Sequence, residues 1–190
     1  MELFGEITAD RPLLVVALRE EGEYLHALGL PVLVTGAGKV RAAAATARTL
    51  ADQRPSEVIN LGTAGALKDG LVGIHVIGRA VQHDFDGEAI FELIGENFAP
   101  PIELGDGPGL ATGDRFVADQ TLRERLAKLA DLADMEGYAV AAAAQAVGVP
   151  VRLVKIVSDD GTEDAARSWS DSMSGCAEQL AGWVAREVPS

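Results

Sequence analysis

The segment that decides the fold is residues 134–161, DMEGYAVAAAAQAVGVPVRLVKIVSDDG. It opens with Asp134 and Glu136, which stand at the start of an alanine-rich stretch that predicts a helix packed closely against a sheet. Pro150–Val157 is rich in β-branched residues and predicts a strand, and Asp159 follows its end. Acids at a helix start and at a strand end are how an α/β enzyme gathers carboxylates at one edge of its sheet.

The rest of the chain repeats this alternation of strands and helices. Short, unbroken apolar runs are typical of strands buried on both faces. One such run is Leu13–Leu18, and further strands are expected at Pro31–Val34, Glu57–Leu61 and Ile74–Val81. Helices are expected at Glu23–Leu28, Val40–Asp52, Thr121–Leu132 and Trp169–Glu187, and residues 87–109 are expected to form loop or short strand. The order predicts one α/β domain over residues 1–190, with a mostly parallel sheet between helices.

The charge of the chain bounds its partners. A formal net charge of −13 repels phosphates and anionic lipid surfaces, so neither nucleic acid nor a membrane is expected as a partner. No apolar run reaches about 18 residues, the length that spans a bilayer. The N-terminal stretch lacks the basic and apolar regions of a signal peptide. We therefore expect a cytoplasmic protein.

The cysteine and histidines predict neither a disulfide nor a metal site. Cys176 is the only cysteine, and His26, His75 and His83 lie far apart without ligand spacing. No metal or other cofactor is therefore expected. His75, inside an apolar run, is interpreted as structural. His83 and Asp84 follow the end of a predicted strand, which leaves a role in a site open.

Two glycine-containing segments follow predicted strands. Thr35–Lys39, TGAGK, opens the helix at Val40 and presents backbone N–H groups to an anion or a hydroxyl. It lacks the spacing of a Walker A loop. Gly62–Ala66, GTAGA, lets a ligand approach the backbone closely. Taken alone, a tight turn explains such a segment equally well.

Six motifs together carry a resemblance to a known family. In chain order they are Ile59–Gly65, Val72-Gly73, His83-Asp84, Thr112–Phe116, Asp134–Glu136 and Val157–Asp159. The set resembles the nucleoside phosphorylase superfamily, and most of all its hydrolytic branch, the 5'-methylthioadenosine/S-adenosylhomocysteine nucleosidases. The resemblance covers nearly the whole chain. It implies a single domain with a mixed, partly barrel-like sheet, and irreversible hydrolysis of the N-glycosidic bond between adenine and a 5'-modified ribose.

The resemblance also implies roles for ten residues. Two are catalytic: Glu21 would activate water, and Asp159 would protonate the leaving base. The others would form the substrate site. Glu136 would bind the ribose hydroxyls, Met135 would pack against the sugar, and Ala64 and Gly65 would lie under the ribose and base. Phe116 would stack on the purine, the Val117 backbone would contact the base edge, Trp169 would lie against the 5' substituent, and Ser158 would orient Asp159.

The chemistry fits these residue types independently. Breaking an N-glycosidic bond develops positive charge on the ribose and negative charge on the base. A carboxylate stabilises the first charge and deprotonates water, whereas a carboxylic acid supplies a proton to the second. These roles require environments that push two pKa values apart. Neighbouring acids leave alternatives open: Glu20 rivals Glu21, Asp160 neighbours Asp159, and Asp134 is interpreted as a helix cap.

A phosphate-dependent phosphorylase is the main alternative function. Phosphate requires arginine or several positive donors, and the related phosphorylases carry an arginine where this chain has Asn60. Lys39 and Arg41 are the remaining basic candidates, so the sequence favours water as the nucleophile. A non-catalytic nucleoside-binding protein is less favoured, because all three expected carboxylates are present.

The chain is shorter than the family in two places. Only Gly29–Leu33 fills the position of a β-hairpin, and only residues 87–110 fill that of a full helix. Parts of the family's 5' pocket and dimer contact lie there. A homodimer is expected, but the 5' substituent and the preferred base stay open, and futalosine-type hydrolysis with a bulkier 5' group is an alternative.

Overall fold

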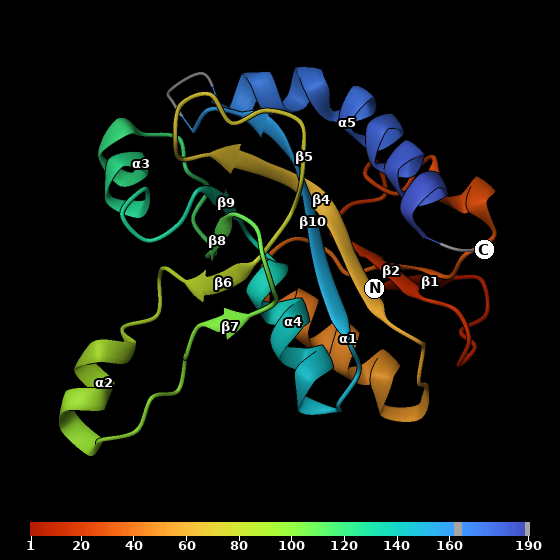
Figure 1. Ribbon diagram of the computed structural model, residues 1–190, viewed down its shortest axis with the longest axis horizontal. Helices are drawn as coiled ribbons and strands as arrows, with labels where there is room; N and C mark the ends of the chain where they lie inside the picture. The colour runs from red at the N-terminus through yellow and green to blue at the C-terminus, as the bar shows by residue number, and fades with distance from the viewer. Residues whose placement is uncertain (162–164, 189–190) are drawn as a thin grey trace.

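Ten strands join in one mixed sheet in the computed structural model, which describes residues 1–161 and 165–188 (Figure 1). The strand order is β1-β3-β2-β4-β9-β8-β6-β7, and β10 pairs with β4 and β5. The strands are β1 (Glu2–Phe4), β2 (Leu13–Val16), β3 (Val32–Val34), β4 (Val58–Ala66), β5 (Ile74–Val76), β6 (Arg79–Gln82), β7 (Ile102–Glu103), β8 (Gly109–Thr112), β9 (Leu132–Asp134) and β10 (Val151–Asp159). The α/β fold with a mixed, mostly parallel sheet is confirmed.

Strand β4 holds the two parts of the sheet together. Its first residues pair with β2, residues Val58–Gly65 run parallel to β10, and its last residues, Gly65 and Ala66, pair antiparallel with β9. Gly62–Ala66 was expected to follow the strand, but the strand continues through it. The prediction stopped too early because glycines are usually read as turn residues, whereas here they allow other groups to approach the strand closely.

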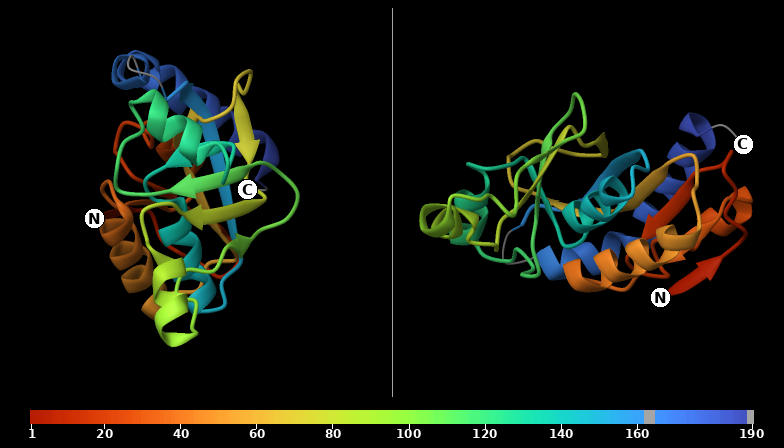
Figure 2. Two further views of the ribbon diagram at one scale, coloured as in Figure 1. Left: turned by 90° about the vertical axis from the view of Figure 1, so that its left-hand side faces the viewer. Right: turned by 90° about the horizontal axis from the view of Figure 1, so that it is seen from below.

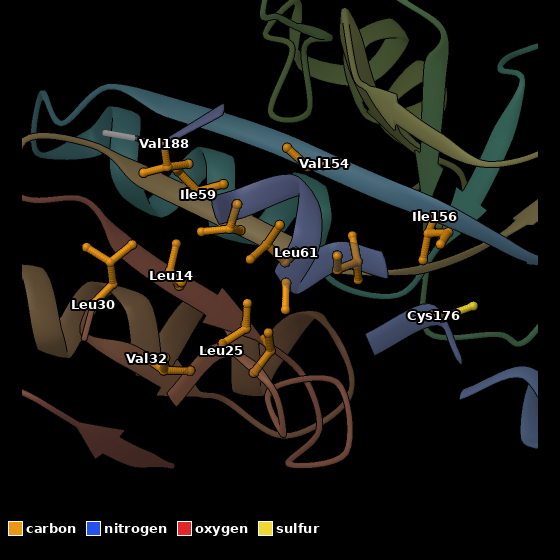
Figure 3. Packing of buried hydrophobic residues seen from close by; sticks show 14 of the residues in the cluster. Leu14, Leu25, Leu30, Val32, Ile59, Leu61, Val154, Ile156, Cys176 and Val188 are labelled. Atoms are coloured by element: carbon orange, nitrogen blue, oxygen red, sulfur yellow. The ribbon is translucent and has the colours of Figure 1, made fainter. Parts of the chain in front are cut away.

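The helices cover both faces of the sheet (Figures 1 and 2). Side chains of β2 alternate between two cores, as the period of a strand requires. Leu13 and Val15 pack with α1 (Lys39–Asp52) and α4 (Gly137–Ala146). Leu14 and Val16 pack with α5 (Ala165–Glu187) and the 3-10 helix η1 (Leu25–Leu28) in the core drawn in Figure 3. Among the described helices, none is long and apolar enough to cross a membrane.

The run Ile74–Val81 is two strands rather than one. β5 pairs antiparallel with β10, whereas β6 pairs parallel with β8. The chain changes partner at Gly78, where an added Cβ would lie only 2.6 Å from the carbonyl oxygen of Gly105. The sequence alone did not reveal the break, because Gly105, which crosses the chain at this point, lies far from Gly78 in sequence.

Two further predictions differ from the structure, one at the boundary of a helix and one in the type of element. The helix expected at Thr121–Leu132 is α3 (Gln120–Leu126), and Leu132 begins β9, because Asp131 bonds back to Gly109 of β8. Residues 87–109 contain the helix α2 (Gly87–Ile94), which Asp86 caps by accepting a hydrogen bond from the Ala89 N–H. α2 stands away from the sheet (Figure 2), and none of its residues is buried.

Candidate active site

All ten residues predicted to form the site line one cavity of about 340 Å³. They are Glu21, Ala64, Gly65, Phe116, Val117, Met135, Glu136, Ser158, Asp159 and Trp169. The cavity has the size of a site for a small organic molecule. It lies where β2, β4 and β10 end, and these strands run parallel. The segments that follow β8 and β9 complete its wall, so the cavity occupies the carboxyl edge at which α/β proteins bind ligands.

Glu21 is buried, and four hydrogen-bond donors hold its carboxylate in the cavity wall. Its Oε2 accepts hydrogen bonds from the Ala17 and Leu18 N–H groups, both at 3.1 Å. Its Oε1 accepts from the Thr63 N–H at 3.0 Å and from the Thr63 hydroxyl at 3.3 Å. Glu20, the rival from the sequence, is exposed and does not line the cavity. The geometry therefore presents Glu21, with a fixed orientation, to a molecule in the cavity.

Asp159 lies on a β-bulge at the opposite side of β4. The β10–β4 register shifts between Val157 and Asp159, and bulges commonly redirect a side chain beside a site. The carboxylate accepts hydrogen bonds from the Ser158 hydroxyl at 2.9 Å and from the Gly161 N–H at 3.0 Å. Burial raises the pKa of Asp159, and these two bonds oppose the rise. Its neighbour Asp160 is exposed.

Glu136 stands at the N-cap position of α4. Its Oε1 accepts a 2.7 Å hydrogen bond from the Gly38 N–H, in the glycine turn before α1. Burial, and then the charge of Asp134, raise the pKa of Glu136 to about 7, while Lys155 acts in the opposite direction. The turn was expected to present N–H groups to an anion, and the carboxylate of Glu136 is one such anion.

A buried polar network lies behind Glu136. Asp134 accepts hydrogen bonds from the Gly137 N–H at 2.7 Å, as a helix cap would, and from the Thr112 hydroxyl at 2.5 Å. It also forms a 2.8 Å ion pair with Lys155. Sequence reasoning missed Lys155, although a lone lysine inside an apolar strand was a usable signal, because an unpaired buried ammonium is costly.

The basic residues considered for phosphate lie outside this cavity. The Lys39 ammonium binds Asp84 and donates to Gln82 Oε1 at 3.0 Å, and Arg41 does not line the cavity. Asp84 also accepts from the Asp114 N–H at 2.8 Å. His83, the other open candidate, has two buried ring nitrogens without a hydrogen-bond partner among the described residues. The structure thus gives Asp84 a supporting contact and brings neither His83 nor Asp84 into the lining.

Asn60 and Trp169 are fixed by internal hydrogen bonds. Asn60 is buried; its amide donates to the Val15 carbonyl at 3.1 Å and its Oδ1 accepts from Lys155 at 2.8 Å. The indole N–H of Trp169 donates to the Thr63 hydroxyl at 3.0 Å. Trp169 and Phe116 both line the cavity. Within residues 1–161 and 165–188, no group of three or more His, Cys, Asp and Glu side chains is arranged to hold a metal ion.

Comparison with known proteins identifies relatives over most of the chain. The model of the phosphorylase superfamily matches residues 19–106 and 109–187. The 5'-methylthioadenosine/S-adenosylhomocysteine nucleosidase of Actinobacillus succinogenes is 32% identical over 187 residues, which cover 84% of this chain and 80% of the relative. The nucleosidase of the same name from Shewanella oneidensis is 31% identical over 166 residues, or 72% and 70% of the two chains.

Solved structures share the fold at lower identity. Futalosine hydrolase of Helicobacter pylori superposes with a TM-score of 0.83 at 23% identity and covers 93% of this chain and 96% of its own. The 5'-methylthioadenosine/S-adenosylhomocysteine nucleosidase of Neisseria meningitidis, in complex with methylthio-immucillin-A, has the same TM-score and identity, with coverage of 93% and 97%.

Proposed function

The chain belongs to the phosphorylase superfamily, and we propose that it is a purine nucleosidase. In this proposal it hydrolyses the N-glycosidic bond of a 5'-modified adenosine, 5'-methylthioadenosine or S-adenosylhomocysteine, with water as the nucleophile. The observation that carries the proposal is the set of three buried carboxyl groups, Glu21, Glu136 and Asp159, which line one cavity in three different hydrogen-bond environments.

Asp159 is the proposed general acid. Its raised pKa keeps a proton on the carboxyl group closer to neutral pH than for an exposed aspartate. The bond between C1' of the ribose and the base nitrogen breaks, its electron pair goes to the base, and the proton of Asp159 neutralises the base. The Ser158 hydroxyl and the Gly161 N–H fix the direction of transfer. General acid catalysis of this kind contributes about 10²- to 10⁴-fold in rate.

Glu21 and Glu136 act on the sugar side of the bond. Glu21 accepts a proton from water as the water oxygen bonds to C1', and its negative charge stabilises the positive ribose. Glu136 accepts hydrogen bonds from the ribose hydroxyls, with one oxygen already oriented by Gly38. Met135 packs against the sugar, and Phe116 stacks on the purine. The products are a free base and a 5'-modified ribose.

The N–H groups and basic side chains near the cavity already bond to acids of the protein, which supports water over phosphate as the nucleophile. Gly38 and Lys39 use their N–H groups on Glu136 and Asp114, both at 2.7 Å, and the Lys39 ammonium is paired with Asp84. The one basic residue that lines the cavity in the described part of the chain is Arg115, which is paired with Asp119 and lies largely in solvent. A phosphate dianion therefore lacks the cluster of free donors that it requires.

Hydrolysis of futalosine, with a bulkier 5' group, is the second candidate. Its support is the shared fold, since futalosine hydrolase of Helicobacter pylori superposes with a TM-score of 0.83, equal to that of the nucleosidase of Neisseria meningitidis. The proposal also includes the homodimer and the cytoplasmic location expected from the sequence. Exposed apolar side chains of α2, Phe91, Leu93 and Ile94, support the dimer because such side chains are commonly buried by a partner.

A panel assay tests the proposed function. Base release is measured from 5'-methylthioadenosine, S-adenosylhomocysteine, futalosine, adenosine and inosine, each with and without phosphate. The proposal expects release from a 5'-modified adenosine at a rate independent of phosphate, and ¹⁸O from labelled water in the sugar product. Release that requires phosphate and yields a sugar 1-phosphate would establish the phosphorylase alternative. The absence of release from every nucleoside would favour a binding protein.

A further inference from the structure

Lys155 is a buried cation in the middle of β10, and its role is not covered by the proposed mechanism. Its side chain and that of its partner Asp134 are each 1% exposed. Its neighbours Val154 and Ile156 point into the core beneath α5, so Lys155 projects from the opposite face of the strand. Lys155 does not line the cavity, and any effect on the substrate therefore passes through other side chains.

Acidic groups face Lys155 from three other segments. Asp134, at the end of β9, lies 2.8 Å from its ammonium nitrogen, and the charges of Glu136, before α4, and Glu21, after β2, act on it as well. The Glu21 Oε1 and the Lys155 Nζ lie 3.0 Å and 3.5 Å from the point where a Cβ on Gly62 would stand. Lys155 thus lies between Glu21 on one side and Asp134 and Glu136 on the other.

Lys155 supplies positive charge among the buried acids around the cavity. Among the described residues, the buried Asp, Glu, Lys and Arg side chains are Lys155 and the acids Glu21, Asp134, Glu136 and Asp159. Burial lowers the pKa of Lys155, but the charges of Asp134, Glu136 and Glu21, together with the hydrogen bond to Asp134, raise it overall. Lys155 therefore stays cationic, and it opposes the burial and the Asp134 charge that favour the protonated form of Glu136.

We propose that Lys155 is a positioning residue that balances the Asp134 charge behind Glu136 and so favours the carboxylate form of Glu136, which accepts both ribose hydroxyls. The part of this inference that concerns ribose rests on the proposed function. A protonated Glu136 would offer one donor and fewer acceptor sites to the diol. The ion pair with Asp134 and the hydrogen bond to Asn60 hold the ammonium in place.

The test follows the titration of Glu136 itself by ¹³C-carboxyl NMR, with the signal assigned by its loss in Glu136→Gln. Lys155→Met is expected to move the titration upward and Asp134→Asn downward, each by about one to three pH units, the usual effect of one nearby charge. The acidic limb of kcat/KM for the nucleoside is expected to shift in the same directions. Lys68→Met is the matched control, because it breaks an exposed ion pair with Asp131 and should move neither measurement.

Two comparisons make the test decisive. If both single variants lose activity while the Glu136 titration stays in place, the pair is only structural and the inference is overturned. If Lys155→Met does not fold, Asp134→Asn is compared with the double variant, which leaves no unpaired buried charge. The double variant must then titrate higher than Asp134→Asn, and equal titrations would overturn the inference. A wild type without nucleosidase activity would refute the proposed function, while the NMR titration would still test Lys155.

Discussion

The Gly38 N–H donates a 2.7 Å hydrogen bond to Oε1 of Glu136, across 98 residues of sequence. This bond joins the glycine turn before α1 to the acid before α4. Gly38 occupies the N-cap position of α1 without a side chain of its own, so the carboxylate supplied by Glu136 satisfies a free N–H at that end of the helix. The helix end in turn orients the group proposed to bind ribose.

Gly38→Ala tests this contact. Gly38 has φ of 95°, and an added Cβ would lie 3.1 Å from Asp114 Oδ1. We expect a loss of stability of about 1–2 kcal/mol from the left-handed backbone and a several-fold rise in KM, because the turn shifts away from Glu136. Thermal unfolding and steady-state kinetics measure both effects. Gly148→Ala, with φ of 71° and no nearby atoms, should lose stability without a change in KM; an equal KM effect in both variants would contradict the assignment.

Glu136→Gln should stabilise the protein in a pH-dependent way. The pKa of Glu136 is about 7 in the folded state, above its ordinary value of 4.5. The unfolded chain therefore releases this proton first as pH rises, and the wild type loses stability between about pH 4.5 and 7. The shift corresponds to about 3 kcal/mol, so the variant should gain about that much at pH 8 and nothing near pH 4.

Denaturant unfolding at these two pH values measures the difference. The same variant should lose nucleoside affinity, since an amide replaces an acceptor-only carboxylate. A stability difference that is equal at pH 4 and pH 8 would show that Glu136 titrates normally.

Gly65→Ala should displace the proposed acid. An added Cβ would lie 2.9 Å from Asp159 Oδ1, closer than real Cβ contacts allow. A misplacement of about 1 Å in a reacting group costs about 100-fold in rate, so we expect a loss of kcat on that scale with a smaller effect on KM. Gly175→Ala, where the Cβ meets nothing within 4 Å, is the control. Unchanged kcat in Gly65→Ala would separate Asp159 from the chemistry.

Leu93→Asp tests the expected dimer. Leu93 is 82% exposed on α2, and a charge in an apolar interface is strongly unfavourable. Light scattering coupled to size exclusion should find a dimer for the wild type and a monomer for the variant. Leu129→Asp, at an exposed leucine outside α2, should remain dimeric. A monomeric wild type would remove α2 as an interface.

The buried strands and the acids at their ends were predictable from local patterns. Leu13–Val16 is an unbroken apolar run because helices cover both of its faces. Glu21 lies in the segment after this strand, and Asp159 is the last residue of β10. Glu21 was assigned from the family resemblance with Glu20 as its rival, and the structure favours Glu21 in burial, since Glu21 is buried and Glu20 is exposed.

Features set by distant contacts were not predictable in this way. The break at Gly78 depends on its crossing with Gly105, and the end of α3 depends on the pairing of Asp131 with Gly109. The partners of Lys155 come from β4 and β9, so its charge could be explained only in three dimensions. The roles of the ten residues in the cavity stay predictions until they are measured.

The most direct test of the account is adenine release from 5'-methylthioadenosine in phosphate-free buffer, by the wild type and by Asp159→Asn. We predict release by the wild type and a loss of about 10²- to 10⁴-fold in the variant, because an amide cannot supply the proton to the base. A wild type that releases no base from this or any other purine nucleoside, or that releases base only when phosphate is added, would contradict hydrolysis by Glu21 and Asp159.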